Sequence, residues 1–335
     1  MELTVRTNQR TYSVFIGRGY ISRIAELAGI LNNAFIVTDS GVPACWIEKV
    51  TLQYPKAPVF MMQQGESNKN LDTYTDLLRS MISSGLNRND TVIAVGGGVV
   101  GDLAGFAAAT YMRGIRFINI PTTMLAQIDS SIGGKTAVDM DDYKNIVGAF
   151  WQPHCVIIDP DTLTTLPSRH VSNGLAEAVK MGMIRDEALF EMFEDDMYTD
   201  RFEHIITRSV ELKKEIVEED EYEGGLRKIL NFGHTVGHGY ESYFGFDRYL
   251  HGECVAMGML KILENEEIKC RLKTVLQRLG LPTQCDADAD QLMEIIRKDK
   301  KAETSDTISV IQVRKIGKAE IESLSLSEIK LRLSK

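Results

Sequence analysis

The chain has 335 residues, 44% hydrophobic and 25% charged, a composition typical of a globular protein with room for two domains. Its net charge of -9 and the lack of a Lys/Arg-rich stripe argue against a nucleic-acid partner. The sequence contains no apolar run of about 18 residues, no secretory signal pattern and no C-x-x-C pair among five cysteines. We therefore expect a cytoplasmic protein with reduced thiols and no membrane segment.

The first half of the chain alternates strand and helix signals. Two short runs, residues 3–6 and 12–16, predict a small hairpin or an edge of a sheet. Further strands are predicted from apolar, β-branched runs at residues 34–38, 58–62, 91–95, 117–120 and 155–159, with helices between them at 71–83 and 103–110. Strands that alternate with helices form βαβ units, so we predict an α/β domain with a mostly parallel sheet over residues 1–166.

Helical periodicity dominates after residue 168. The predicted helices span residues 175–184, 201–219, 226–243, 254–279 and 287–300. One later strand signal lies at residues 307–313. We place the domain boundary between Leu166 and Pro167 and predict an all-α second domain over residues 167–335.

A glycine-rich turn follows the predicted strand at residues 91–95. Gly96, Gly98 and Gly101 fit the G-x-G-x-x-G spacing, which brings backbone N–H groups close to a pyrophosphate at a helix N-terminus. The turn follows a middle strand, however, and the next strand does not end in an acidic residue. Asp39, which ends an earlier strand, is the better ribose-binding candidate. The alternative is a tight turn that serves packing alone.

A second loop with anion-binding character spans residues 121–139. Thr122 and Thr123 stand at a predicted helix start, and the Gly-Gly-Lys run ending at Lys135 resembles the end of a Walker motif. Asp129 stands where the first Walker glycine belongs, so the pattern does not favour nucleoside triphosphate hydrolysis. Lys135, with the Lys-Asn pair at 144–145, suits contacts to an oxyanion. An ordinary surface loop is the alternative.

One stripe of polar residues stands out in the second half of the chain. Arg227, Asn231, His234 and His238 are spaced by four, three and four residues, which would place them on one face of an α-helix. A cation, an amide and two imidazoles make a poor core, so this face is interpreted as the wall of a site. A solvated polar face is the alternative.

Histidines and carboxylates near this stripe suggest a metal site. His234 and His238 form an i, i+4 pair, His251 opens another predicted helix, and Glu177 lies three residues before Lys180. Two histidines with one carboxylate form an open catalytic zinc set, but the spacing does not decide which two histidines bind. For Glu177 and Lys180, an exposed helical ion pair is the alternative.

These motifs together resemble those of the 3-dehydroquinate synthase family, and the resemblance extends from about residue 65 to 301. It is carried by the ordered blocks G-G-G-V-V-G-D-L-A-G, P-T-T-M-L-A-Q-I-D-S-S-I-G-G-K-T-A-V, K-N-I-V-G-A-F, G-L-A-E-A-V-K, L-R-K-I-L-N-F-G-H-T-V-G-H and H-G-E-C-V-A-M-G-M.

The resemblance implies an NAD-binding first domain and a helical second domain that holds Zn²⁺ or Co²⁺ through Glu177, His234 and His251. It implies a proton-transfer role for His238, and a homodimer in which Arg113 reaches the active site of the other subunit. The implied NAD contacts are Asp39, Glu66, Lys69, Gly97, Gly98, Asp102, Thr122, Thr123, Lys135, Lys144, Asn145 and Thr165. The implied substrate contacts are Asp129, Lys135, Asn145, Lys180, Lys213, Arg227, Asn231 and His238, with either Lys300 or Lys301.

The family reaction converts the sugar phosphate 3-deoxy-D-arabino-heptulosonate 7-phosphate to 3-dehydroquinate and phosphate in the shikimate pathway. The resemblance implies transient oxidation by NAD, β-elimination of phosphate, re-reduction, ring opening and intramolecular aldol closure. The substrate carboxylate would be bound by Lys213 and Arg227. The phosphate would be bound by Lys135, Asn145, Asn231 and Arg113.

Two positions and one short stretch depart from the family pattern. Tyr143 stands where a glycine is usual, Gly41 stands where an asparagine is usual, and A-E-T-S-D follows the D-K-K run. Three other functions are alternatives. Another sugar phosphate cyclase would differ in the side chains that bind the substrate carboxylate and phosphate. An NAD- and metal-dependent polyol dehydrogenase would need no cluster of cations. A nucleotide-binding regulatory protein would leave the metal set unexplained.

Overall fold

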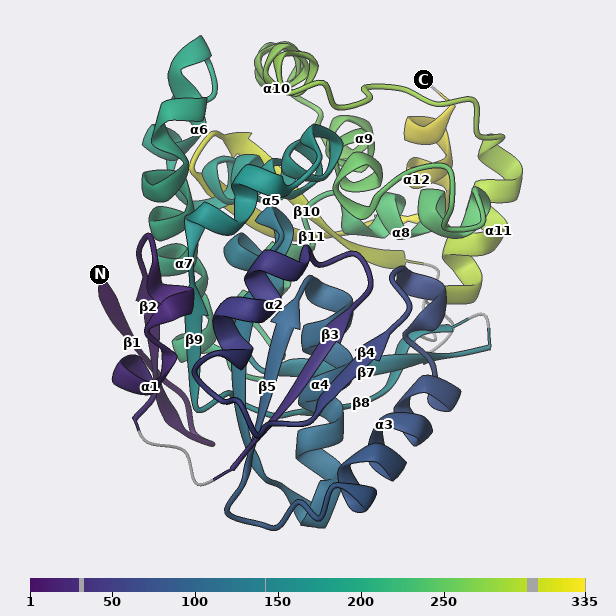
Figure 1. Ribbon diagram of the computed structural model, residues 1–335. Coiled ribbons are helices and arrows are strands. Elements are labelled where there is room, and N and C mark those ends of the chain that lie inside the picture. The colour runs from purple at the N-terminus through teal and green to yellow at the C-terminus, as the bar shows by residue number, and fades with distance from the viewer. Residues whose placement is uncertain (30–32, 142, 300–306, 335) are drawn as a thin grey trace. The chain divides into compact units, whose positions relative to one another are not determined.

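The computed structural model of the chain describes residues 1–29, 33–141, 143–299 and 307–334 (Figure 1). The chain forms two compact units. The first comprises Met1–Leu166 with Lys213–Tyr222, and the second comprises Pro167–Leu212 with Glu223–Lys335. No helix in the described part of the chain is long and apolar enough to cross a membrane.

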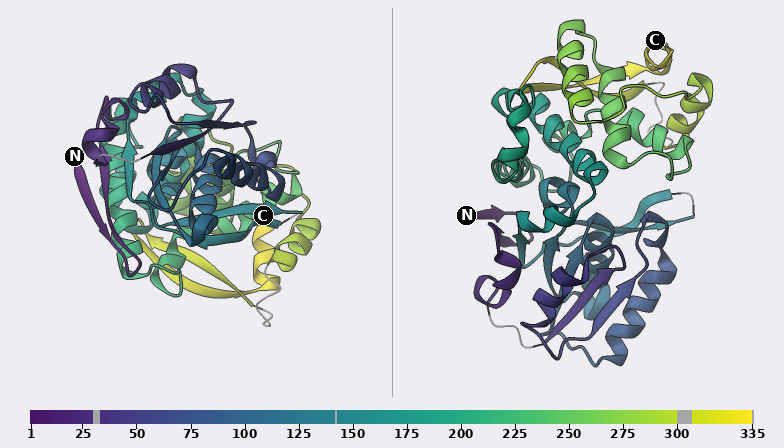
Figure 2. Two further views of the ribbon diagram at one scale, coloured as in Figure 1. Left: turned by 60° about the horizontal axis from the view of Figure 1, so that its bottom comes forward. Right: turned by 45° about the horizontal axis from the view of Figure 1, so that its top comes forward.

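A seven-stranded sheet, in the order β1-β2-β9-β6-β5-β3-β4, forms the frame of the first unit. Figure 2 shows the ribbon from two further sides. β1 pairs with β2 in antiparallel orientation, and every other neighbouring pair is parallel. The strands are β1 (Glu2–Arg6), β2 (Thr11–Ile16), β3 (Ala34–Asp39), β4 (Val59–Met62), β5 (Thr91–Gly96), β6 (Arg116–Pro121) and β9 (Cys155–Ile158). The predicted mostly parallel sheet is confirmed, and so is the antiparallel pair at its edge.

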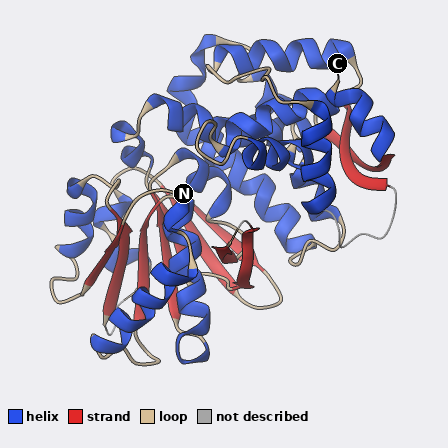
Figure 3. Ribbon diagram, turned by 90° about the vertical axis from the view of Figure 1, so that its right-hand side faces the viewer, coloured by secondary structure: helices blue, strands red, loops and turns tan. Residues whose placement is uncertain are grey.

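Hydrophobic side chains cover both faces of this sheet, as expected for parallel strands. Phe35 and Val37 of β3 point into a cluster with Leu77, whereas Ile36 points into the opposite cluster with Trp46. The helices that supply these clusters are α1 (Ile24–Leu27), α2 (Ala44–Thr51), α3 (Leu71–Ser83) and α4 (Gly98–Thr110). Helices flank the strands in the side view (Figure 3). The burial of both faces leaves the strand ends as the places where polar groups can gather.

An antiparallel hairpin of β7 (Lys135–Met140) and β8 (Tyr143–Phe150) adds a second, smaller sheet to the first unit. A π-helical turn at Ala126–Ser130 leads into it. The short segment Lys213–Tyr222 belongs to this unit although it comes late in the chain. Buried Glu221 holds it there, because its carboxylate accepts hydrogen bonds from the backbone N–H of Asn8 at 2.8 Å and from Gln152 Nε2 at 3.0 Å.

The second unit is mainly helical. Its helices are α5 (Ser168–Arg185), α6 (Glu187–Glu191), α7 (Phe202–Glu219, whose last turns belong to the first unit), α8 (His234–Tyr243), α9 (His251–Ile262), α10 (Glu266–Arg278), α11 (Ala289–Asp299) and α12 (Leu326–Leu333). One correction applies to the predicted all-α domain. It contains the antiparallel hairpin β10 (Thr307–Lys315) and β11 (Lys318–Ser325), whose first strand includes the predicted run at 307–313.

The predicted helix over residues 226–243 is wrong in its first half. Leu226–Asn231 forms a 3-10 helix, η7, and the chain then breaks at Phe232 and Gly233 before α8 begins. Gly233 has φ +79°, and a Cβ there would lie 2.7 Å from the carbonyl oxygen of Val255 on α9. Glycine at position 233 therefore permits both the left-handed backbone conformation and the close approach of α9. The break at this residue divides the polar stripe between η7 and α8.

Candidate active site

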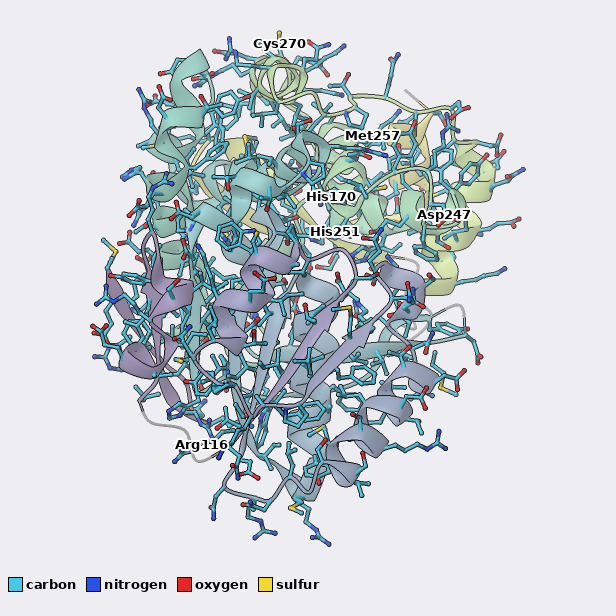
Figure 4. The ribbon with its side chains drawn as sticks, in the orientation of Figure 1. Arg116, His170, Asp247, His251, Met257 and Cys270 are labelled. Carbon is cyan, nitrogen blue, oxygen red and sulfur yellow. The ribbon has the colours of Figure 1, made fainter. Side chains whose placement is uncertain are left out.

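Three ligand-type side chains meet inside the second unit. Glu177 comes from the middle of α5, and His234 and His251 are the first residues of α8 and α9; Figure 4 labels His251. Glu177 Oε1 lies 3.7 Å from His234 Nε2 and 3.6 Å from His251 Nε2. Ligands at 2.0–2.1 Å from a tetrahedral metal are separated by about 3.3 Å. The three atoms are therefore spaced nearly as a single ion requires.

Both imidazoles of this set are oriented through their other nitrogen. His234 Nδ1 lies 3.2 Å from the carbonyl oxygen of Phe232, and His251 Nδ1 lies 3.1 Å from Glu241 Oε1. A neutral ring that donates its Nδ1 proton through such a contact presents its Nε2 lone pair toward Glu177, where a cation would take it. Among the described residues, Glu177 Oε1 accepts no hydrogen bond although its side chain is fully buried. A buried carboxylate oxygen facing two imidazole Nε2 atoms fits a bound cation.

The charges around this set also favour a cation. Burial would raise the pKa of Glu177, but Lys180, His234 and His251 lower it well below the usual range, so the carboxylate is ionised. Burial and Lys180 hold the pKa of His234 well below its usual value, which keeps this imidazole neutral. Burial would lower the pKa of His251, but Glu241 and Glu177 raise it to about 10. The two carboxylates thus stabilise a positive charge at the place where a metal ion would supply one.

A second group of polar residues surrounds a buried lysine in the first unit. The Lys69 side chain is only 4% exposed, and its Nζ lies 2.7 Å from Glu66, 3.3 Å from Asp102 and 3.9 Å from Asp139. It also donates a hydrogen bond of 2.8 Å to Asn145 Oδ1. Burial lowers the pKa of Lys69, but Asp102 and Glu66 outweigh it, so the ammonium stays charged. Burial raises the pKa of Asp102 to about 6 even beside this ammonium.

The glycine turn lies at a reversal of strand order in the sheet. The chain passes from β3 to β4 on one side, and from β5 to β6 on the other. In open α/β sheets, ligands bind at the carboxyl ends of the strands where the order reverses in this way. Asp39 ends β3, Gly97 and Gly98 join β5 to α4, and Thr122 follows β6. These residues therefore lie along the carboxyl edge of three neighbouring strands, beside the N-terminus of α4.

Close packing explains why this turn needs glycine. A Cβ on Gly97 would lie 3.1 Å from Thr123 Cγ2, and one on Gly98 would lie 3.0 Å from Ser130 Oγ. Side chains at these positions would press the β6 loop away from the first turn of α4. The backbone N–H groups of that turn are the donors that a phosphate would use.

The comparisons with known proteins agree with this geometry. The family described as 3-dehydroquinate synthase N-terminal matches residues 59–173, and the family described as 3-dehydroquinate synthase C-terminal matches residues 174–302. The chain belongs to the 3-dehydroquinate synthase family. It is 41% identical to the 3-dehydroquinate synthase of Thermoanaerobacter pseudethanolicus over 98% of both chains, and 39% identical to that of Streptococcus mutans over 100% of both.

Solved structures of other sugar phosphate cyclases are similar to the chain. One is 2-deoxy-scyllo-inosose synthase in complex with carbaglucose-6-phosphate, NAD⁺ and Co²⁺, with TM-score 0.88, 27% identity and 99% of both chains covered. Another is the 2-epi-5-epi-valiolone synthase of Streptomyces hygroscopicus with NAD⁺ and Zn²⁺, with TM-score 0.87 and 26% identity over 98% of this chain and 97% of that one. A probable glycerol dehydrogenase from Sinorhizobium meliloti, at 16% identity and TM-score 0.63, shares the fold alone.

The residues that the family resemblance implies fall into three groups in the structure. In the second unit, Lys180 pairs with Glu177, and the ring of His238 lies 5.4 Å from that of His234 and 5.9 Å from that of His251. Arg227 and Asn231 lie on η7, which packs against α5; Arg227 is buried, and Asn231 Nδ2 donates to Glu223 Oε1 at 2.6 Å.

The first unit contains the other two groups. Lys144 joins the group around Lys69, because its Nζ lies 3.9 Å from Glu66. Lys213 Nζ donates to the carbonyl oxygen of Asp129 at 2.6 Å and to its carboxylate at 2.8 Å. Lys135 begins β7. These positions place the Lys213–Asp129 pair at the π-helical turn, a type of irregularity that often marks functional sites.

Several predicted residues are not brought together with these groups. Arg113 is exposed at the end of the 3-10 helix Tyr111–Arg113, with φ +65°, and it makes no hydrogen bond or ion pair with another predicted site residue in the described structure. Thr165 accepts a hydrogen bond from Trp46 Nε1 at 2.8 Å. Lys300 and Lys301 lie outside the described residues.

Two residues of these groups were missed in the sequence. Asp139 lies beside Lys69, and its carboxylate accepts a hydrogen bond from the backbone N–H of Asn145 at 2.8 Å. Glu241 holds His251. A signal for Glu241 did exist, because it lies one helical turn after His238 and extends the i, i+4 pattern by a carboxylate at i+7. Asp139 carries no comparable signal, since only the fold of the β7–β8 hairpin places it near Lys69.

Proposed function

We propose that the chain is a 3-dehydroquinate synthase, which converts 3-deoxy-D-arabino-heptulosonate 7-phosphate to 3-dehydroquinate and phosphate. The proposal includes NAD and a divalent metal, Zn²⁺ or Co²⁺, as cofactors. The observation that carries it is the buried set of Glu177, His234 and His251 in a chain 41% identical to a named synthase over 98% of its length.

The metal-binding part of the proposal follows from the three converging ligand atoms. Glu177 Oε1 and the Nε2 atoms of His234 and His251 would hold the ion, and three protein ligands leave a position open for substrate. When bound, NAD supplies a reversible hydride acceptor and the metal ion polarises the hydroxyl that is oxidised. The glycine turn before α4 and the group around Lys69 would bind the dinucleotide.

The remaining proposed roles belong to the side chains around these sites. His238 is exposed and stands one turn after His234, so its ring can exchange a proton with a substrate hydroxyl. The buried cations Lys213 and Arg227 would bind the substrate carboxylate. Lys135, Asn145, Asn231 and Arg113 would bind the phosphate. These two sets of residues, each containing cations, suit a substrate with two anionic groups. A polyol dehydrogenase, whose substrate is neutral, would have no need for them.

One assay separates the proposed reaction from its competitors. The reaction releases phosphate and forms a carbon–carbon bond without net redox change, so NADH should not accumulate. We would supply the heptulosonate phosphate with trace NAD and Zn²⁺, and follow phosphate release together with carbocycle formation. NADH produced in proportion to substrate would indicate a dehydrogenase. Turnover of glucose 6-phosphate or sedoheptulose 7-phosphate, without turnover of the heptulosonate phosphate, would indicate another cyclase.

A homodimer is also part of the proposal, because exposed Arg113 is implied to act in the other subunit's site. Arg113→Ala and His238→Ala chains should each be nearly inactive. When the two are co-expressed, heterodimers would contain one site with both residues intact, so about a quarter of parent activity should return. A monomeric enzyme, or one in which Arg113 serves its own subunit, would show no recovery.

A further inference from the structure

A buried carboxylate lies behind the proposed metal ligands. Glu241 is 4% exposed on α8, and its Oε1 lies 3.1 Å from His251 Nδ1. Burying an ionised carboxylate is costly unless it is paired and hydrogen-bonded. Here the pairing reaches a ring whose opposite nitrogen, Nε2, lies 3.6 Å from Glu177 Oε1. Glu241 and Glu177 thus hold the two ends of one imidazole.

The other histidine of the set is held differently. His234 Nδ1 lies 3.2 Å from the neutral backbone carbonyl oxygen of Phe232, two residues earlier in the chain. That contact depends on the backbone of the break before α8 and survives side-chain substitution. The orientation of His251 depends instead on a side chain ten residues away in sequence. His251 is therefore the ligand whose geometry a single substitution can release.

We propose that Glu241 is a positioning residue for the metal site: it accepts the Nδ1 proton of His251 and so directs the Nε2 lone pair at the ion. The inference rests on the metal site of the proposed function. An anionic partner also makes the imidazole a stronger donor than a carbonyl partner does, and loss of such a partner weakens metal binding about 10- to 100-fold. Glu241 needs no contact with substrate to exert this effect.

The test measures metal affinity in the full-length, metal-free protein. Zn²⁺ would be titrated by chelator competition into the parent, Glu241→Gln and Glu241→Ala. We expect Kd to rise about 10-fold for Gln, which keeps an acceptor without the charge, and up to about 100-fold for Ala. The absorption spectrum of bound Co²⁺ should also change in both variants, which a loss of stability alone would not cause.

A matched control lies at the neighbouring position. Tyr240 is buried on the same helix, and its hydroxyl interacts with Cys285 rather than with a histidine. Tyr240→Phe therefore removes one buried polar contact from α8 and should leave the Zn²⁺ Kd at the parent value. Thermal unfolding of all metal-free chains would identify any variant that fails to fold. If Glu241→Ala fails to fold, Glu241→Gln, which preserves the shape of the side chain, can still be compared with the parent.

Two results would overturn the inference alone. One is an unchanged Zn²⁺ Kd in both Glu241 variants. The other is a parent that binds two ions and a Glu241→Ala chain that binds one, because Glu241, His238 and His251 also have ligand atoms within 4.8 Å of one another and would then form a second site. A parent chain that binds no Zn²⁺ would instead overturn the proposed function together with the inference.

Discussion

The contact between α5 and α9 allows the metal geometry to be tested without changing a ligand. Gly252 follows His251 on α9, and its backbone N–H donates to Asn173 Oδ1 at 2.6 Å. A Cβ built on Gly252 would lie 1.9 Å from the carbonyl oxygen of Asn173, on the helix that carries Glu177. Gly252→Ala therefore forces the start of α9 away from α5.

The size of this movement follows from the clash. Non-bonded carbon and oxygen atoms rarely approach closer than about 3 Å, so the helices must separate by about 1 Å. If His251 moves with its helix, its distance of 3.6 Å from Glu177 Oε1 grows to about 4.6 Å. Two ligands at 2.0–2.1 Å from one tetrahedral ion stand about 3.3 Å apart. We expect the Zn²⁺ Kd of Gly252→Ala to rise more than about 100-fold, with about 1–3 kcal/mol of stability lost to overpacking.

Chelator competition with Zn²⁺ and urea unfolding of the metal-free protein would measure the two effects separately. Gly280→Ala provides the control, because Gly280 has φ +70° and a Cβ there meets nothing within 4 Å. This variant should lose about 1 kcal/mol or more through backbone strain and keep the parent Kd for Zn²⁺. The reasoning would be refuted if Gly252→Ala bound Zn²⁺ as tightly as Gly280→Ala does, while its unfolding free energy was equal to or lower than that of Gly280→Ala.

Two further predictions concern the site residues themselves. His234→Ala should lose Zn²⁺, whereas His238→Ala should keep Zn²⁺ and lose turnover, as measured by metal content and phosphate release; equal metal loss in both would reverse the assignment. Burial raises the pKa of Asp102 to about 6, so the native protein binds its proton more tightly than the unfolded chain between about pH 4 and pH 6. As pH rises through that window, the unfolding free energy of the parent should therefore fall by about 2–3 kcal/mol relative to that of Asp102→Asn. Urea unfolding at several pH values would measure this difference. Parallel pH profiles for the two chains would contradict the prediction.

The positions of the strands could be predicted from the sequence because each strand has a local cause. Buried parallel strands form continuous apolar runs, as in residues 91–95, and these runs locate β5 without any knowledge of its neighbours. The metal-binding residue types at 177, 234 and 251 are also visible locally. Their meeting depends on tertiary structure, however, so spacing alone left the choice among three histidines open.

The helix break at Gly233 shows what spacing could not reveal. Residues 226–243 have helical periodicity, and no proline interrupts them. The continuous helix is nevertheless excluded, because α9 packs so closely that a Cβ on Gly258 would lie 2.1 Å from the carbonyl oxygen of Gly233. This contact joins residues 25 positions apart, so a pattern read along the chain does not contain it. The second strand of the hairpin after residue 306 is also hard to predict, because it is only partly buried and lacks a continuous apolar run.

The break also determines the electrostatics of the proposed metal site. Because α8 starts at His234 and α9 at His251, both imidazoles stand at helix N-termini, where the helix dipole is positive and opposes a cation. Buried Lys180 adds a full positive charge beside Glu177. Two carboxylates, Glu177 and Glu241, offset these charges only in part once a divalent ion is bound. The loaded site would keep a net positive charge, and that charge favours a substrate with a carboxylate and a phosphate over a neutral polyol.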